Sequence, residues 1–332
     1  MSEENVQLAA EAWQAIDQGD FDLALQHARQ LIDSGEETGY RIQASATYEA
    51  DGDIDAAIAI LQQGIAVYPD SWELYLQLSN LFADQESFDE AYATLGKARQ
   101  IPEADLHWVD YYKAQILVQE ERIEDALATL QGIQHPEVIN EALCMRLELL
   151  EEQEHYDDML HSVAAVWDKL TPPETSDDAA TLSRICSYVA IAGYYEDMAP
   201  ETIEHYIDQA IAFQRNNEDA LWLIREMAGE YSDDAQMYAL HVSGRFHDNI
   251  EEAPFAGAPF VTSYAVLADN EDEALDMVRA FEIEQVNTES IRIESAEIEE
   301  MEETDEQQPK GIYFVSDFFP PDAPNGNGHY EA

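Results

Sequence analysis

Few side chains in this sequence have the types and spacing that metal or catalytic chemistry needs. His155, Asp158 and His161 offer two imidazoles and a carboxylate, which are donors that bind zinc in proteins. His161 lies six residues after His155, and that separation fits poorly with one face of a helix. The spacing therefore argues against a metal site at these residues.

The C-terminal part of the chain is rich in charged groups. The run from Glu297 to Glu306 holds seven acids in ten residues, but it lacks the glycine turn and ordered spacing of a calcium loop. We therefore interpret this acidic run as solvent-exposed charge at the end of a strand and not as a calcium site. The residues that this part offers for catalysis form no recognisable nucleophile–base pair; they are Arg279, Arg292, Tyr313 and Asp317. The sequence thus predicts no catalytic residue, no metal site and no cofactor.

An aromatic cluster has two interpretations. Trp108, Tyr111 and Tyr112 follow one another at helical spacing. Aromatic residues in such a pattern usually pack in a core. If Trp108 and Tyr111 instead face a groove, they are natural anchors for a bound peptide or helix.

The elements that position these residues come from a repeat. A short phrase recurs five times, and its apolar third residue is Phe21, Ile54, Phe88, Ile123 and Tyr156, in steps of 33 to 35 residues. Such a period indicates a stack of small units that cannot bury their apolar faces alone. Each unit is predicted to be two amphipathic helices, with alanines where they cross and prolines such as Pro69 at the ends.

The small residue of the first helix, the apolar turn residue, the alanine of the second helix and the terminal proline together resemble the tetratricopeptide repeat family. The resemblance covers about residues 5–170 clearly and continues in degenerate form to about residue 243. The repeat from Tyr40 to Pro69 is the clearest, whereas Met159 replaces the expected alanine in the fifth. The resemblance implies a right-handed α-solenoid and makes binding the expected function.

Beyond the fifth repeat the pattern weakens. A sixth helical pair is expected at Leu182–Tyr195 and Thr202–Phe213, and a degenerate last pair at Glu218–Glu230 and Asp233–Val242. These patterns predict a solenoid of six to seven helical pairs over residues 1–246 and a linker over 247–258. A small β-α-β-β unit follows over 259–319, with an acidic loop at about 297–309. The last segment, 320–332, is predicted to be a disordered tail.

The small C-terminal unit has predicted strands at Phe260–Leu267, Ser290–Glu294 and Gly311–Ser316, with a helix opening at Asn270. This order suggests about half of a ferredoxin-like fold with a right-handed crossover. Three strands and one helix make a thin core. We therefore expect the unit to lean on the last helices of the solenoid or to pair with another chain, for example as a homodimer.

The charge is extreme: 71 acids against 15 bases give a net charge of −56. A field of this sign repels nucleic acids and anionic membrane surfaces. The acidity fits a solvated surface suited to a salty cytoplasm, a docking surface for a basic partner, or mimicry of nucleic acid. The acids are spread along the whole chain, which favours the first reading. Cys144 and Cys186 are expected to be buried free thiols, and the absence of a signal-like N-terminus or long apolar run predicts a cytoplasmic protein.

The family resemblance also implies a groove lined by first helices. Its predicted lining is Ile42, Glu49, Leu76, Asn80, Trp108, Tyr111, Gln115 and Glu148. Asn80 matches one position of the family's clamp for a C-terminal carboxylate, but Leu76, Ile42 and Tyr111 stand where basic residues are expected. The groove should therefore prefer basic or apolar protein segments.

These observations favour a cytoplasmic, non-enzymatic adaptor. Two alternatives remain: an acidic inhibitor or immunity-type protein that blocks a basic toxin or nucleic-acid enzyme, and, with the least support, an enzyme with its site in the C-terminal unit.

Overall fold

The computed structural model describes residues 2–246, 257–285, 291–301 and 308–321. Most of the predicted linker, the centre of the predicted acidic loop and the predicted tail beyond residue 321 lie outside these ranges. Contacts divide the chain into two compact units, Met1–Ala142 and Leu143–Ala332. The sequence suggested a boundary after residue 246, whereas the contacts divide the chain between Ala142 and Leu143.

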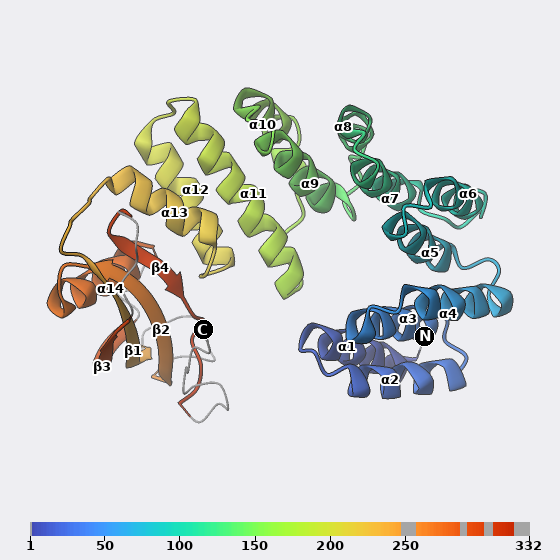
Figure 1. Cartoon of the computed structure of the whole chain (residues 1–332), viewed down its shortest axis with the longest axis horizontal. Helices are drawn as coiled ribbons and strands as arrows, with labels where there is room; N and C mark the ends of the chain where they lie inside the picture. The colour runs from blue at the N-terminus through green and yellow to red at the C-terminus, as the bar shows by residue number, and fades with distance from the viewer. Residues whose placement is uncertain (1, 247–256, 286–290, 302–307, 322–332) are drawn as a thin grey trace. The chain divides into compact units, whose positions relative to one another are not determined.

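The first unit is a series of antiparallel helical pairs (Figure 1). Its helices are α1 (Glu3–Asp17), α2 (Phe21–Asp33), α3 (Thr38–Asp51), α4 (Ile54–Val67), α5 (Trp72–Asp84), α6 (Phe88–Ala98), α7 (Leu106–Gln119) and α8 (Ile123–Gln131). Helix α9 (Ile139–Glu151) crosses the boundary between the units, and α10 (Tyr156–Ala164) follows it. The five marker residues of the repeat are the first residues of α2, α4, α6, α8 and α10, which explains the fixed period.

Each turn between paired helices uses a left-handed residue. The five positions, all two residues before the marker, are Gly19 (φ 73°), Gly52 (66°), Glu86 (58°), Glu121 (59°) and Glu154 (57°). A left-handed residue ends the first helix and redirects the chain. In the first two turns the next residue caps the second helix: Asp20 and Asp53 accept hydrogen bonds from the Leu23 and Ala56 amides at 3.1 and 2.9 Å.

The alanines of the second helices lie where the helices approach most closely. Ala24, Ala57, Ala91 and Ala126 are all 0% exposed. Met159 takes the same place in the fifth pair and is equally buried. A larger, flexible side chain fills a wider gap there, so the departure from the repeat pattern does not interrupt the core.

The second unit continues with helices. After a short 3-10 turn at Trp167–Lys169 come α11 (Ser176–Tyr195), α12 (Pro200–Phe213) and α13 (Glu218–Ala228). The first two confirm the expected sixth pair, with α11 starting six residues earlier than predicted. A capping box between Thr175 and Asp178 fixes that start.

A four-stranded antiparallel sheet completes the unit. Its strands are β1 (Gln236–Phe246), β2 (Pro259–Ala268), β3 (Ile291–Glu300) and β4 (Gly311–Val315), in the order β3-β1-β2-β4, and α14 (Glu271–Gln285) joins β2 to β3. The predicted strands and helix are therefore present, but the unit is β-β-α-β-β. The predicted helix at Asp233–Val242 is wrong, because this segment forms the central strand β1.

The side chains of β1 explain this correction. Tyr238, Leu240 and Val242 are buried and alternate with more exposed residues, which is the period of a strand. Strand β1 pairs with β2 on one side and β3 on the other. Gly244 lies at a register shift in the β1–β3 pairing, where an added Cβ would lie 2.5 Å from the Arg292 carbonyl oxygen.

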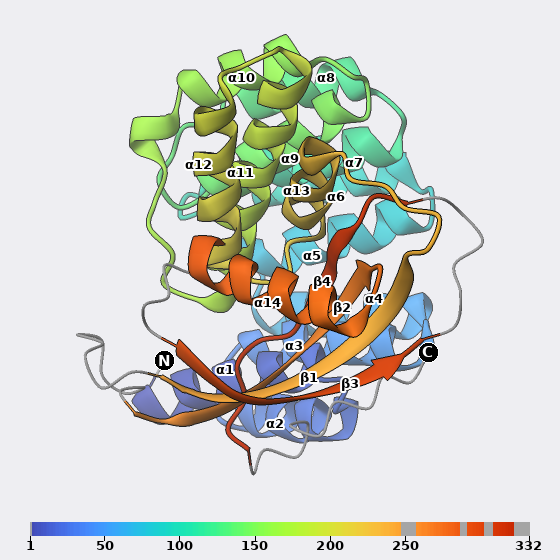
Figure 2. The same cartoon turned by 90° about the vertical axis from the view of Figure 1, so that its left-hand side faces the viewer.

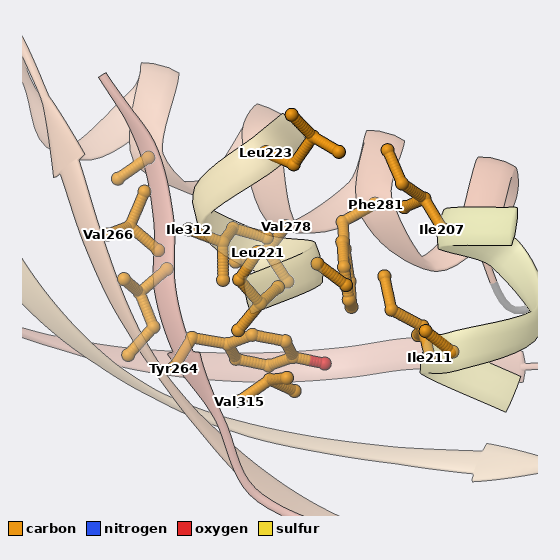
Figure 3. Packing of buried hydrophobic residues seen from close by; sticks show 14 of the residues in the cluster. Ile207, Ile211, Leu221, Leu223, Tyr264, Val266, Val278, Phe281, Ile312 and Val315 are labelled. Atoms are coloured by element: carbon orange, nitrogen blue, oxygen red, sulfur yellow. The ribbon is translucent and has the colours of Figure 1, made fainter. Parts of the chain in front are cut away.

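Helices cover one face of the sheet, and Figure 2 shows α14 lying across it. The buried core joins α12 and α13 to α14, β2 and β4 through Ile207, Ile211, Leu221, Leu223, Tyr264, Val266, Val278, Phe281, Ile312 and Val315 (Figure 3). The small sheet thus shares its core with the last helices, as its thin predicted core led us to expect. Within the described ranges, no helix is both long enough and apolar enough to cross a membrane.

Candidate protein-binding surface

Polar side chains connect the first helices of three successive repeats. Gln77 on α5 donates to the Ser45 hydroxyl on α3 at 2.6 Å and to the Arg41 carbonyl at 3.2 Å. Toward α7, Asn80 donates to Gln115 Oε1 at 3.3 Å. We call the set Arg41, Ser45, Gln77, Asn80, Asp84, Gln115 and Gln119 the polar face of α3, α5 and α7; its last contact is Gln119 Nε2 to Asp84 Oδ1 at 2.9 Å.

The hydrogen bonding of this face is incomplete. Arg41 Nε, Gln77 Oε1 and Asn80 Oδ1 are buried and make no hydrogen bond within the described part of the chain. Leaving such a group unsatisfied costs about 1–3 kcal/mol. The face therefore holds one donor and two acceptors that its own side chains leave unpaired and cover from solvent.

Aromatic rings continue the face along α7. Trp108 and Tyr111 precede Gln115 by seven and four residues, so the three share one stripe of the helix. The Trp108 and Tyr111 rings meet edge to face with centroids 5.7 Å apart. Both side chains are half-buried. Burial raises the pKa of the neighbouring Tyr112, and the positive charge of Arg41 on α3 partly opposes that shift.

Acidic groups border the same helices. Glu37, just before α3, accepts a hydrogen bond from the Ser71 hydroxyl at 2.8 Å. Burial is the main cause that raises the pKa of its carboxyl group, and the Ser71 bond opposes the shift. A nearby cation stabilises the ionised form of a carboxyl group that burial makes costly to ionise.

The comparisons with known proteins address this geometry. The tetratricopeptide repeat family model matches residues 48–105, which span α4, α5 and α6. The resemblance stated from the sequence is confirmed over this segment, and the polar face includes its helix α5. No curated protein matches the chain.

Several solved structures are similar to this chain. One is YrrB, described as a TPR protein with an unusual peptide-binding site, at 20% identity, covering 58% of this chain and 95% of that one with a TM-score of 0.34. Another is PilW, a type IV pilus biogenesis factor, at 14% identity, covering 66% of this chain and 98% of that one with a TM-score of 0.42. A third is pilF of Pseudomonas aeruginosa, at 14% identity, covering 69% of this chain and 98% of that one with a TM-score of 0.40.

The structure separates the predicted groove residues into two groups. Asn80, Gln115, Trp108 and Tyr111 lie on the polar face or its aromatic continuation. Ile42 and Leu76 are 0% and 3% exposed and belong to the apolar clusters between helices. They therefore lie in the packed core between helices, and their predicted contact with a ligand is wrong for the described conformation.

The two remaining predicted residues lie elsewhere. Glu49 is exposed near the end of α3. Glu148 belongs to the second unit, where it pairs with Arg184 at 3.0 Å. Sequence reasoning missed Arg41 and Gln77, each of which is adjacent to a residue that was predicted.

The residues considered for catalysis do not converge. Arg279 pairs with Asp276 within α14, and Tyr313 on β4 lies under the Arg225 guanidinium at 3.7 Å from ring centroid to Cζ. Arg292 lies on β3, the opposite edge of the sheet from β4. His161 bonds to the Asp157 carbonyl at 2.8 Å.

The sheet does bring one serine and one histidine together. Ser263 Oγ lies 2.9 Å from His241 Nδ1, and Glu297 is opposite His241 in the β1–β3 register. An acyl-transfer site would also need free amide donors for an oxyanion. The backbone N–H of Ser263 already donates to Ser316 Oγ at 2.9 Å. The amide nearest to the Ser263 hydroxyl is therefore not available to bind an oxyanion.

A separate cavity of about 870 Å³ lies in the second unit among α11, α12 and α13. Its lining is Tyr194, Asp197, Met198, Pro200, Ile203, Glu204, Ile207, Asp208, Ile224, Met227 and Ala228. It combines apolar side chains with three carboxylates and no basic residue.

Proposed function

We propose that this chain is a non-enzymatic protein-interaction scaffold. Its polar face of α3, α5 and α7 binds a protein segment that carries basic and apolar side chains. The observation that supports this proposal most strongly is the set of buried, unpaired atoms Arg41 Nε, Gln77 Oε1 and Asn80 Oδ1. A peptide main chain offers both N–H donors and C=O acceptors, and a bound segment can pair with these atoms once the side chains that cover them move aside.

Two further features support the chemistry of the partner. Trp108 and Tyr111 lie on the same stripe as Gln115, where half-buried aromatic rings act as anchors for apolar side chains. The net charge of −56 attracts basic segments and repels acidic ones.

A peptide selection tests the proposal. The full chain is used to select binders from a random peptide library, and the affinity of the strongest binder is measured for Asn80→Ala, Trp108→Ala and Gln131→Ala. Gln131 is exposed on α8, outside the polar face, and is the control. We expect the first two variants to weaken binding by roughly tenfold or more and the control to leave it unchanged. Equal affinities for all three variants would remove the polar face from the proposal.

The partner's affinity and salt dependence separate the alternatives. A scaffold binds several segments, whereas an inhibitor or immunity-type protein binds one basic partner very tightly with steep salt dependence. Cys144 and Cys186 are buried and form no disulfide in the described part of the chain, which suits the reducing conditions of the cytoplasm, where we propose the protein acts. A homodimer through the C-terminal unit stays a proposal; its outer strand β3 exposes Glu294, Glu297 and Glu299, so pairing at that edge would be repulsive.

A further inference from the structure

Two loops of the first unit bring an imidazole and two carboxylates together. Asp105 precedes α7, and His135 and Glu137 lie between α8 and α9. One potential ligand atom from each residue lies within 4.8 Å of the others. The imidazole of His107 stacks on that of His135, with centroids 4.9 Å apart and ring planes 16° apart. We propose that Asp105, His135 and Glu137 bind a divalent transition-metal ion of the Zn²⁺ class.

The distances leave room for a bridging ion between the side chains. Asp105 Oδ2 and His135 Nδ1 are 4.0 Å apart, which is too long for a hydrogen bond. Bonds of about 2.0–2.2 Å at tetrahedral angles separate two ligand atoms by roughly 3.3–3.6 Å. A closure of about half an ångström between the two loops therefore completes the geometry, and exposed Glu137 can adjust its side chain.

One carboxylate is already held in place. Asp105 Oδ1 accepts the backbone N–H of His107 at 2.7 Å as the cap of α7, which leaves Oδ2 directed to His135. Outer hydrogen bonds of this kind orient metal ligands. Water can take the fourth position.

The donor set selects the class of metal. An imidazole with two carboxylates suits Zn²⁺ and neighbouring first-row ions, whereas Ca²⁺ and Mg²⁺ prefer oxygen ligands alone. Because the ligands come from the loops before α7 and after α8, a bound ion would join the two ends of the fourth repeat and raise the thermal stability of the folded chain.

Zinc titration of the untagged full chain tests the proposal. Calorimetry is run in millimolar Mg²⁺, which saturates non-specific acidic sites, for the wild type, His135→Gln, Asp105→Asn and His161→Gln. Asparagine still caps a helix, so Asp105→Asn keeps the fold. His161 is the matched control, since it also lies beside an acid, 3.2 Å from Asp157, but is exposed on α10.

We expect one site whose zinc affinity falls by roughly tenfold or more in His135→Gln and Asp105→Asn and is unchanged in His161→Gln. Co²⁺ bound by the wild type should give visible absorption that both ligand variants lose. Equal zinc affinities in all four proteins, or loss only in His161→Gln, would overturn the site. Circular dichroism in EDTA verifies that each variant is folded.

Discussion

Arg215 and Glu282 form an ion pair 2.7 Å long inside the second unit, with Glu282 only 2% exposed. Arg215 lies between α12 and α13, whereas Glu282 is on α14, so the pair joins the last helices to the sheet. The Tyr264 hydroxyl also donates to Glu282 at 2.7 Å, and the Arg215 guanidinium stacks on the Phe318 ring at 3.8 Å. Burial, with Glu282 beside it, holds the pKa of Tyr264 well above its usual range.

Arg215→Met should therefore destabilise the protein strongly. Removing one partner of a buried pair leaves the other charge uncompensated and costs about 3–5 kcal/mol. Chemical denaturation measures the free energy of unfolding. The control is Arg279→Met on α14, which breaks an exposed pair with Asp276 and should cost less than about 1 kcal/mol. Similar losses in both variants would contradict the structural role of the Arg215–Glu282 pair.

The left-handed turn residues give a second prediction. Glu86, Glu121 and Glu154 have positive φ angles and exposed side chains. Replacing each with glycine should stabilise the chain by about 1 kcal/mol, because only glycine adopts this conformation without steric cost. Gly52→Ala is the opposite test and should destabilise by about the same amount. Thermal melts that place Glu86→Gly below the wild type would refute this account.

A third prediction concerns the crowded glycine of β1. In Gly244→Ala the new methyl group would meet the Arg292 carbonyl oxygen and lie 2.6 Å from Phe260 Cζ. We expect a loss of about 1–3 kcal/mol. Gly96→Ala is the control: it lies in α6 with no neighbouring atom within 4 Å, so alanine should stabilise the helix by about 0.5–1 kcal/mol. A neutral Gly244→Ala would mean that β1 and β3 do not approach this closely.

Stability should also depend on pH through Glu37. Burial raises the pKa of this carboxyl in the folded state, so the folded chain holds its proton more strongly than the unfolded chain. The free energy of unfolding then contains a penalty at pH 7 that disappears as the pH falls through the raised pKa. Glu37→Gln should be more stable than the wild type at pH 7, and the difference should shrink in acid. A constant difference between pH 7 and pH 4 would contradict this sign.

The sequence predicted the repeats well because their signal is local. Each marker residue, such as Phe21, begins a second helix, so the period follows directly from the turn chemistry. Strand β1 was missed because the expected repeat favoured a helix over Asp233–Val242, although Tyr238, Leu240 and Val242 already alternate as a strand does. The sequence around β1 did not reveal that this strand pairs with two others.

The candidate site was predicted only in part, for a geometric reason. One residue along a helix turns the side chain by about 100°, so the choice of Ile42 and Leu76 selected the core in place of the adjacent Arg41 and Gln77. Only contacts between helices reveal which atoms stay unpaired. Asp105 and His135 come from two loops 30 residues apart, and no local spacing brings them together.

Hydrogen–deuterium exchange of the full chain, with and without a selected basic peptide, tests the central claim most directly. Binding at the polar face predicts slower exchange in α3, α5 and α7, with loss of that protection in Asn80→Ala. Protection confined to α12 and α13 would place binding at the cavity of the second unit and contradict the proposed site. Selection of acidic peptides would contradict the proposed partner chemistry.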